Sequence, residues 1–600
     1  MNFTDLQAPR DCDRYYCVMS RSPGAMHVAR ISSRYVSKSG DERRYESVLL
    51  RRTFRQEGKV RHETLANLSH LPEQVIALVD AALKGATLVD ADAVFETRRS
   101  VPHGDAAAAH VMASRLGLRD LLGPACPERD LAYALVLSRA VRPAPKLATA
   151  RWWAGGDTTL GMDLGVADAS TDEVYAAMDW LTARQRDIER QLAARHLRED
   201  GIAMFDLSSS WVEGSCCELA AFGHSRDGKR GRRQVEYGLL TDPEGRPVAV
   251  EVFAGNTADQ ESFKTAVTRV RDDFGIERLI MVGDRGMITG TRISDLRKLE
   301  GMGWITALKA PAIARLARDD GPLQMTLFDQ HDLTEISSPD YPGERLICCR
   351  NPFLAAERAH KRADLLAATE KDLAAVKAQV DAGRLTDPDK IGIRIGKVIG
   401  KHKVAKHFLT QVTGASFTYQ RDQGKIDAEA ALDGIYVIRT SVAGHILDPA
   451  AVVSAYKDLK HVERDFRITK ADDLDLRPIH HYLASRVRGH VLICMLACYL
   501  TWHLRQALAE LTFTDQHIPV PASPVAPARR SPHAKAKDGA RHNDDGLPVY
   551  RYRDLLAHLA TLDRQVITFA GRQIEKLTTP TPVQRRAFEL LGAPVPLTIG

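Results

Sequence analysis

The stretch IAMFDLSSSWVEG, residues 202–214, marks the point where a mainly helical pattern gives way to strand-like runs. It is an apolar run broken by one aspartate, Asp206, and it predicts a buried strand. A second such run, RLIMVGDRGM at 278–287, ends at Asp284 between two glycines that favour a tight turn. Segments of helical pattern separate these strands from those that follow. Alternating strands and helices predict an α/β core whose strands are buried on both faces.

Asp206 and Asp284 each stand at the end of a predicted strand. In α/β sheets, ligand and catalytic groups collect just beyond the ends of strands. A single aspartate in such a place is more often a helix N-cap or a turn residue. Asp284, which precedes MITGTRIS, could be only that. The pair therefore suggests a site without establishing one.

The stretch YKDLKHVERDFRITK, residues 456–470, predicts a helix that adds a third carboxylate. Tyr456, Glu463 and Lys470 stand at equal steps of seven, close to two helical turns. We therefore expect them to share one helix face at intervals of about 10 Å. The ordinary alternative is a solvated helix face held by ion pairs between residues four apart.

The overall composition is that of a globular protein with several domains. The chain has 600 residues with 44% hydrophobic and 27% charged residues, and its net charge is only +6. No secretory signal is visible, and the apolar run VLICMLACYL at 491–500 is too short to cross a bilayer, so it predicts a buried helix. Nine cysteines without a CxxC pair disfavour zinc and predict reduced thiols in the cytoplasm.

The sequence pattern divides the chain into segments that differ in composition and in predicted secondary structure. The segment before the core is helical, a long helix and basic strands interrupt the core, and a stretch rich in Pro and Ala has almost no large apolar residues. We predict a basic β-hairpin region at 1–70, a helical domain at 71–200, core segments at 201–310 and 434–512, an insertion at 311–433, a flexible linker at 513–548 and a small C-terminal region at 549–600.

Two basic segments are candidates for contact with DNA. Arg51 and Arg52 belong to the N-terminal hairpin, and Arg230 and Arg232 belong to the loop HSRDGKRGRRQ. Basic hairpins and loops can follow a phosphate backbone, but they can equally be solvated turns. The chain has no G-x-x-x-x-G-K-[ST] phosphate loop, which disfavours an ATP-driven motor.

These blocks together resemble the DDE transposases of bacterial insertion sequences. The resemblance is to the group with a Y-x2-R-x3-E-x6-K signature and a β-rich insertion before the glutamate. Asp206, Asp284 and Glu463 match the three carboxylates, and Tyr456 and Lys470 match the ends of the signature. The likeness spans most of residues 28–510 and includes the blocks GHSRDGKR, YGLLTDPEGRPVAVEVFAGNTAD and VGDRGM.

The resemblance implies a fold and a reaction. The fold is α/β, an RNase H-like catalytic core interrupted by the insertion, with a basic β-hairpin and a helical N-terminal region. The reaction is cleavage of double-stranded DNA at terminal inverted repeats, followed by attack of the 3′-hydroxyl on target DNA. A homodimer in the synaptic complex and a cytoplasmic, nucleoid-associated protein without membrane contact are further expectations.

The resemblance also implies roles for the site residues. Two divalent ions, Mg²⁺ with Mn²⁺ as a substitute, suit phosphodiester chemistry and oxygen ligands. Asp206 and Asp284 would be ligands of both metals, Glu463 would complete one, and Tyr456 and Lys470 would hold the DNA phosphate.

The chain departs from the family at one signature position. Leu459 stands where the signature has arginine, and Lys460 or Arg467 could supply the positive charge. Related members stack a flipped base on an aromatic residue. Trp304 is the only tryptophan between Asp284 and Glu463, although a plain core strand explains it better.

Two other functions remain possible from the sequence. One is a metal-dependent DNA nuclease of the same fold, and the other is a non-catalytic DNA-binding descendant. The insertion and the basic N-terminal region favour the transposase over the nuclease, because synapsis and end recognition need additional surfaces. All three carboxylates are present, which argues against the descendant.

Overall fold

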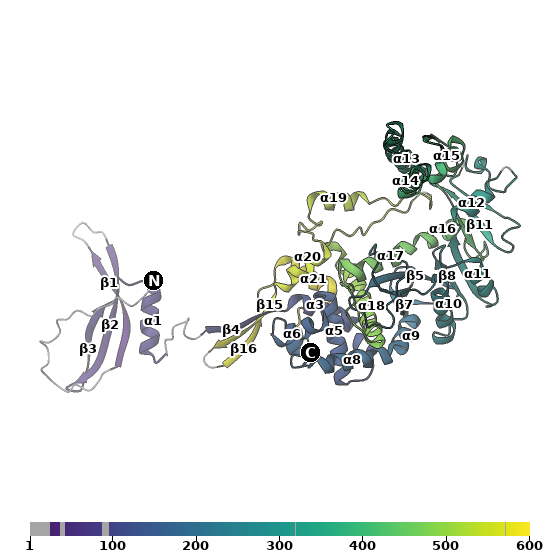
Figure 1. The fold of residues 1–600 in the computed structure, drawn as a ribbon. Helices are drawn as coiled ribbons and strands as arrows, with labels where there is room; N and C mark the ends of the chain where they lie inside the picture. The colour runs from purple at the N-terminus through teal and green to yellow at the C-terminus, as the bar shows by residue number, and fades with distance from the viewer. Residues whose placement is uncertain are drawn as a thin grey trace. The chain divides into compact units, whose positions relative to one another are not determined.

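The computed structural model describes residues 25–36, 42–86, 95–318, 320–329, 331–521, 523–569 and 572–599 (Figure 1). The chain forms two compact units. The first comprises Met1–Arg98 with Val566–Ile574, and the second comprises Arg99–Gln565 with Glu575–Gly600.

The first unit is built on an antiparallel sheet of three strands in the order β1-β2-β3. The strands are β1 (Ala25–Val36), β2 (Glu42–Gln56) and β3 (Lys59–Asn67), and α1 (Glu73–Leu83) follows them. A small core of Val48, Leu68 and Ile76 joins the sheet to the helix. The region predicted as a β-hairpin at 1–70 therefore contains three strands in its described part.

The second unit contains a mixed sheet of eight strands in the order β10-β11-β14-β9-β8-β5-β6-β7. Its strands are β5 (Gly201–Trp211), β6 (Gln234–Thr241), β7 (Pro247–Ala254), β8 (Leu279–Gly283), β9 (Met302–Ala307), β10 (Leu333–Ile336), β11 (Arg345–Arg350) and β14 (Ile435–Thr440). β5, β8 and β9 run parallel, whereas β6 is antiparallel to both β5 and β7. The predicted α/β core is confirmed as a mixed α/β fold.

The register of the central strands positions two carboxylates. Phe205 of β5 pairs with Gly283 of the parallel strand β8. Asp206 follows Phe205 within β5, and not at the strand end as predicted, whereas Asp284 directly follows the last residue of β8. The two aspartates therefore lie at the same level of adjacent strands, which run about 4.8 Å apart. Successive side chains alternate between the two faces of a sheet, and this pairing therefore directs both carboxylates to one face.

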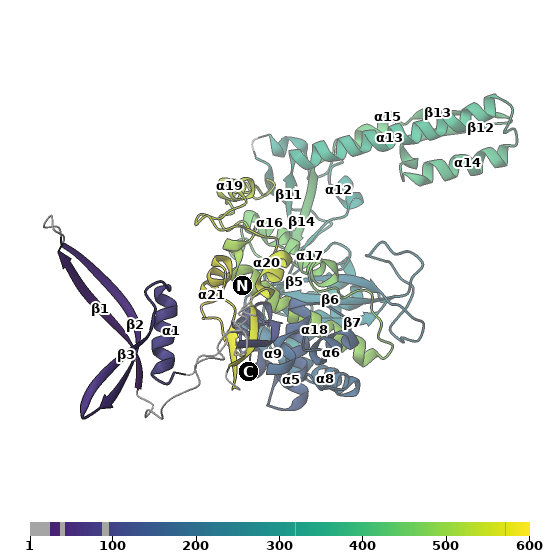
Figure 2. The same ribbon diagram turned by 90° about the vertical axis from the view of Figure 1, so that its left-hand side faces the viewer.

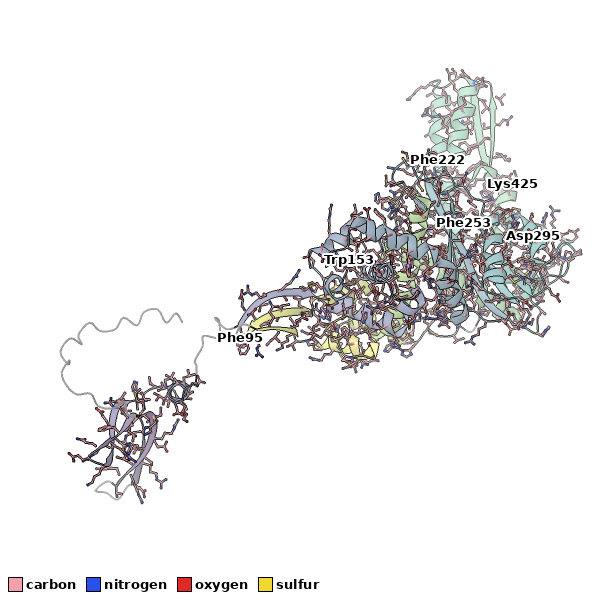
Figure 3. The ribbon with its side chains drawn as sticks, turned by 90° about the horizontal axis from the view of Figure 1, so that it is seen from below. Phe95, Trp153, Phe222, Phe253, Asp295 and Lys425 are labelled. Carbon is pink, nitrogen blue, oxygen red and sulfur yellow. The ribbon has the colours of Figure 1, made fainter. Side chains whose placement is uncertain are left out.

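Helices surround the sheet. The helical part before β5 packs against the long helix α18 (Ala484–Ala507). Trp153 (Figure 3) is fully buried there, and its indole N–H donates to Ser138 Oγ at 3.0 Å. The helices of this part are α3 (Gly104–Arg115), α4 (Leu118–Leu122), α5 (Pro127–Val141), α6 (Lys146–Ala154), α7 (Thr159–Asp163), α8 (Thr171–Ala183) and α9 (Gln185–His196).

A small sheet and further helices complete the described part of the chain. Strands β4 (Phe95–Pro102), β15 (Asp563–Phe569) and β16 (Arg572–Leu577) form a sheet of three strands in the order β16-β15-β4. The flanking and C-terminal helices are α10 (Asp259–Thr268), α11 (Gly290–Leu296), α12 (Ala310–Leu316), α16 (Pro449–Lys457), α17 (Leu459–Arg467), α19 (Pro532–Ala540), α20 (Tyr552–Ala560) and α21 (Pro582–Leu591).

Helix α18 is long and apolar enough to cross a membrane by length and composition alone. However, 83% of its most apolar window is buried inside the protein, as expected for a core helix. The buried helix predicted around residues 491–500 is therefore confirmed.

The segment between β11 and β14 forms an elongated arm in the second unit (Figure 2). Its elements are α13 (Pro352–Asp381), α14 (Pro388–Lys401), the hairpin β12 (Phe408–Thr413) and β13 (Ser416–Arg421), and α15 (Gln423–Ala430). The arm has its own core, which includes Leu373, Ile391, Ile395 and Phe417.

The prediction of a β-rich insertion is wrong, because helices dominate the arm. Residues 391–401 have many β-branched residues and glycines, which favoured strands. Ile391 and Ile395 are four residues apart, however, and both pack into the core of the arm from α14. This spacing is the helical period, and it outweighs the strand propensity of isoleucine.

The segment 513–548 is packed rather than a free linker, which corrects a second prediction. It contains α19, and Val525 in it is only 1% exposed. Polar anchors replace the missing apolar residues. Lys537 donates to the carbonyl oxygens of Ala509 and Thr514, and Ser531 Oγ donates to Asp515.

The stability of the helical part is expected to depend on pH through Asp105. This carboxyl at the start of α3 is 9% exposed, and burial raises its pKa from 3.8 to about 6. Because the folded-state pKa of Asp105 lies above its unfolded value, the free energy of unfolding is highest below about pH 4 and falls as the pH rises through 6. The loss at pH 8 is up to about 3 kcal/mol.

We therefore expect Asp105→Asn to raise the urea midpoint at pH 8 and to raise it progressively less as the pH falls toward 4. Urea denaturation followed by circular dichroism measures the effect. A gain that is independent of pH would contradict this assignment.

Candidate active site

A cavity of about 1200 Å³ lies between the large sheet and the base of the arm, and the three predicted carboxylates line it. Asp206 comes from β5, Asp284 follows β8, and Glu463 comes from α17. The opposite wall is supplied by α12, α13 and α15. The structure thus brings together three acidic residues that the sequence separates by up to 257 positions, since 463 − 206 = 257.

The charges of these carboxylates are largely uncompensated. Asp206 is half-buried, and its Oδ1 accepts a hydrogen bond from the Leu207 N–H at 2.8 Å. Burial raises the pKa of Asp206 to about 7, and repulsion from Asp284 and Glu463 adds to the shift. Within the described part of the chain, none of the three carboxylates forms an ion pair.

This donor set suits a divalent cation, which would offset the mutual repulsion. Hard cations such as Mg²⁺ take carboxylate oxygens and keep part of their water shell, so a few carboxylates suffice. Among the residues that the structure describes, however, no three His, Cys, Asp or Glu side chains are already grouped closely enough to hold a metal ion. The carboxylates face a common space and do not converge on one point.

The prediction of one continuous helix face for Tyr456, Glu463 and Lys470 is wrong. α16 ends at Lys457, α17 begins at Leu459, and Lys470 lies in a π-helical segment, Ile468–Asp472. Each of the three residues therefore lies on a different helical segment. Tyr456 and Glu463 both line the cavity, whereas Lys470 does not, because seven-residue spacing keeps residues on one face only in uninterrupted helical geometry.

The ends of the signature lie in different surroundings. Tyr456 lines the cavity, and burial, followed by the charge of Asp284, raises the pKa of its hydroxyl to about 12. Lys470 is 8% exposed and does not line the cavity. Its ammonium donates to Asp227 Oδ1 at 2.8 Å.

The cations considered for the missing signature arginine are also separated. Lys460 lines the cavity together with Leu459 and Glu463. Arg467 is exposed on α17 and is not part of the cavity wall.

The other predicted cations are not among the residues that line the cavity. Arg230 and Arg232 are exposed in the loop between β5 and β6. The Arg232 guanidinium forms an ion pair with the Glu213 carboxylate at 3.2 Å. Arg51 and Arg52 are half-buried on β2 of the first unit, where Arg52 pairs with Glu63 at 2.6 Å.

Several cations of the cavity were missed by sequence reasoning. Arg285 follows Asp284 directly, so its position next to a candidate ligand was a usable signal. The others come from the arm or from α16, and no local pattern places them near the carboxylates. Lys425 (Figure 3) belongs to α15. The missed cations of the cavity wall are Arg285, Arg358, Lys406, Lys425 and Lys457.

Trp304 lies in β9, and its side chain is 3% exposed. The interpretation as a core residue is confirmed. A base cannot stack on this ring unless the sheet opens.

Comparison with known proteins identifies two matching family models. Residues 34–92 match the IS1634 family transposase N-terminal domain, and residues 211–500 match the transposase DDE domain. No curated protein matches the chain.

Among solved structures, the chain is similar to the cryo-EM structure of a piggyBac transposase synaptic complex with hairpin DNA. The sequence identity is 7% and the TM-score is 0.33, over 76% of each chain. A likeness this distant supports no conclusion about the site.

Proposed function

Because this chain is an insertion-sequence transposase of the DDE type, we propose that Asp206, Asp284 and Glu463 are its catalytic carboxylates. The observation that carries the proposal is that all three line one cavity without forming ion pairs in the described part of the chain. Asp206 and Asp284 come from adjacent parallel strands, which holds their spacing rigidly.

We also propose that the core of the second unit is RNase H-like. The strand order β7-β6-β5-β8-β9, with three antiparallel strands followed by two parallel ones, supports this assignment. Residues 311–433 then form the insertion, and Glu463 lies on a helix after it.

DDE transposases act with divalent metal ions, and Asp206, Asp284 and Glu463 would hold two Mg²⁺ ions, or Mn²⁺ in their place. When bound, such ions activate an oxygen nucleophile and stabilise the leaving oxygen of a phosphodiester. The negative charge of the three carboxylates provides the affinity for these ions.

The remaining side chains of the cavity would bind the DNA. The hydroxyl of Tyr456 stays protonated near neutral pH because its pKa is about 12, so it can donate a hydrogen bond to a phosphate oxygen. Lys460 and Arg285 line the core side of the cavity, and Arg358 and Lys425 line the arm side. Cations on both walls suit a phosphate backbone that passes between them.

The proposed substrates are the terminal inverted repeats and the target duplex. Cleaving two ends and joining them requires at least two active sites, so we propose a homodimer in the synaptic complex. The three-stranded sheet that carries Arg51 and Arg52, and the loop that carries Arg230 and Arg232, supply further DNA contacts. The protein would act in the cytoplasm, at the nucleoid.

A plasmid excision assay tests the proposed function. A reporter gene is interrupted by this gene with its native flanks, and the chain is supplied as wild type, Asp206→Ala or Glu463→Gln. We expect only the wild type to restore the reporter. DNA cutting by purified wild-type protein without reporter restoration would favour the nuclease, and binding of the flanks without cutting would favour the descendant.

Lys460 and Arg467 provide a matched pair for the missing signature arginine. We expect Lys460→Gln to weaken binding of end DNA about tenfold at low salt and to reduce the slope of log affinity against log salt by about 1. Arg467→Gln should change neither quantity, because Arg467 lies outside the cavity wall. Fluorescence anisotropy at several salt concentrations measures both, and equal losses would contradict the assignment.

A further inference from the structure

The basic loop between β5 and β6 contains one acidic side chain that points inward. The Asp227 side chain is 2% exposed, while its neighbours Lys229, Arg230 and Arg232 are exposed. A carboxylate buried to this degree is costly unless cations pair with it.

Two cations from a distant part of the chain meet this carboxylate. Lys470 donates to Asp227 Oδ1 at 2.8 Å, and the Arg477 guanidinium donates to the same oxygen. Lys470 belongs to the π-helical segment that continues α17, seven residues after Glu463. Arg477 lies in the segment that follows it.

The same contacts extend to the strand that carries Asp206. The Arg477 guanidinium lies over the ring of Trp211, the last residue of β5, at 5.3 Å. The backbone N–H of Ile479 donates to the Trp211 carbonyl oxygen at 3.1 Å. Asp227 thus joins the segment after Glu463 to the loop that follows β5, the strand that carries Asp206 and ends at Trp211, five residues beyond it.

We propose that Asp227 is a positioning residue of the catalytic site. Its carboxylate holds Lys470 and Arg477, and in this way it fixes the helix that carries Glu463 relative to the strand that carries Asp206. Lys470, in this chain, is then part of the support of the site and does not contact the DNA phosphate. This inference rests on the proposed roles of Asp206 and Glu463.

The burial of Lys470 favours this role over contact with DNA. To reach a phosphate, the ammonium would have to leave Asp227, and the carboxylate would remain buried with one cation fewer. Breaking one partner out of a buried ion pair is strongly unfavourable. Exposed cations such as Lys460 can reach a phosphate without that loss.

The test uses the full chain with Asp227→Asn, Lys470→Met, the double variant and the conservative Asp227→Glu. Mn²⁺ binding to the complex with end DNA is measured by electron paramagnetic resonance, and DNA affinity is measured without metal. Single-turnover cleavage is followed across Mn²⁺ concentrations, and thermal unfolding reports stability. Glu213→Gln is the matched control, since Glu213 pairs with Arg232 on the surface of the same loop.

We expect both single variants to weaken Mn²⁺ binding by about 10- to 100-fold, the range for loss of a group that supports a metal ligand. DNA affinity should stay unchanged. The double variant should be no worse than Asp227→Asn alone, because that single variant already removes the contact with Lys470. Asp227→Glu should recover part of the Mn²⁺ affinity, and Glu213→Gln should behave as wild type.

Two results would overturn the proposal. If Lys470→Met weakens DNA binding and Asp227→Asn does not, Lys470 is a phosphate contact. If the variants lower only the unfolding temperature and leave Mn²⁺ binding intact, the cluster serves stability alone. The double variant removes both charges, so it keeps the test valid if a single variant fails to fold.

The proposed function has its own control in the same experiment. If Glu463→Gln cleaves DNA as well as wild type, the catalytic assignment fails whatever the Asp227 variants do. If Glu463→Gln is inactive and the Asp227 variants bind Mn²⁺ normally, only the positioning role is lost.

Discussion

Asp284→Ala is expected to abolish DNA cleavage while leaving binding of the element's ends intact. Asp284 is exposed at the cavity, next to Asp206 on the adjacent strand, and no described residue neutralises it through an ion pair. Its carboxylate would be a ligand of the metal ions. Losing a group that merely supports a ligand costs about 10- to 100-fold in affinity or activity, so losing a ligand should cost more than about 100-fold.

Binding of DNA should survive because the substitution removes a negative charge and no cation. The phosphate contacts proposed for Lys460, Arg285, Arg358 and Lys425 are all retained, and one source of repulsion disappears. Cleavage of labelled end DNA with Mg²⁺ or Mn²⁺ is compared with anisotropy measured without metal.

Asp295 provides the control for this experiment. Asp295 (Figure 3) lies on α11, and its carboxylate pairs with Arg292 at 2.9 Å and with Lys298 at 3.4 Å. Asp295→Ala should cleave as the wild type does. If Asp284→Ala still cuts DNA at a wild-type rate, the assignment of the site is wrong.

The core and the carboxylates could be predicted from the sequence because their signals are local. The apolar runs around Asp206 and before Asp284 mark buried strands, and β5 and β8 are present where those runs lie. The amphipathic pattern around Glu463 gives helix α17. Two adjacent parallel strands and helix α17 then bring the three residues to one cavity.

The surroundings of the carboxylates depend on contacts between distant residues, which no local pattern reveals. Lys470 has the spacing of a helix-face residue, yet Asp227, 243 positions earlier, draws it into the interior. The cations Arg358 and Lys425 belong to the arm, and only the path of the chain after β11 brings them to the cavity. In α14 the signal was present in the spacing of Ile391 and Ile395, but propensity pointed to strands.

The segment 513–548 shows a different reason for failure. Its composition correctly excludes an apolar core of its own, but polar contacts attach it to the second unit. Lys457, one residue after Tyr456, donates to the carbonyl oxygens of Val525 at 3.0 Å and Ala526 at 3.1 Å, and also to that of Pro524. The side-chain amide of Asn351 donates to the Val525 carbonyl oxygen at 3.2 Å.

Lys457→Met is therefore expected to release the segment around Val525 from the wall of the cavity. The substitution keeps a long apolar side chain and removes the charge that three carbonyl oxygens share. Hydrogen bonds to a charged group contribute about 1.5–3 kcal/mol each, and part of this is regained when the carbonyl groups meet water. If the free energy that holds the segment in place falls by a net amount on the order of 3–5 kcal/mol, the fraction of molecules in which the segment is detached rises by roughly 100-fold or more.

Hydrogen exchange of a peptide that contains Val525 and Ala526, followed by mass spectrometry, measures this opening. Lys460→Met is the control, because Lys460 is exposed and its partner is Asp458, at 3.5 Å. Faster exchange in Lys457→Met alone would establish that one half-buried ammonium, and not an apolar core, holds this segment beside the cavity. Equal exchange in both variants would mean that Asn351 and the burial of Val525 suffice to hold it.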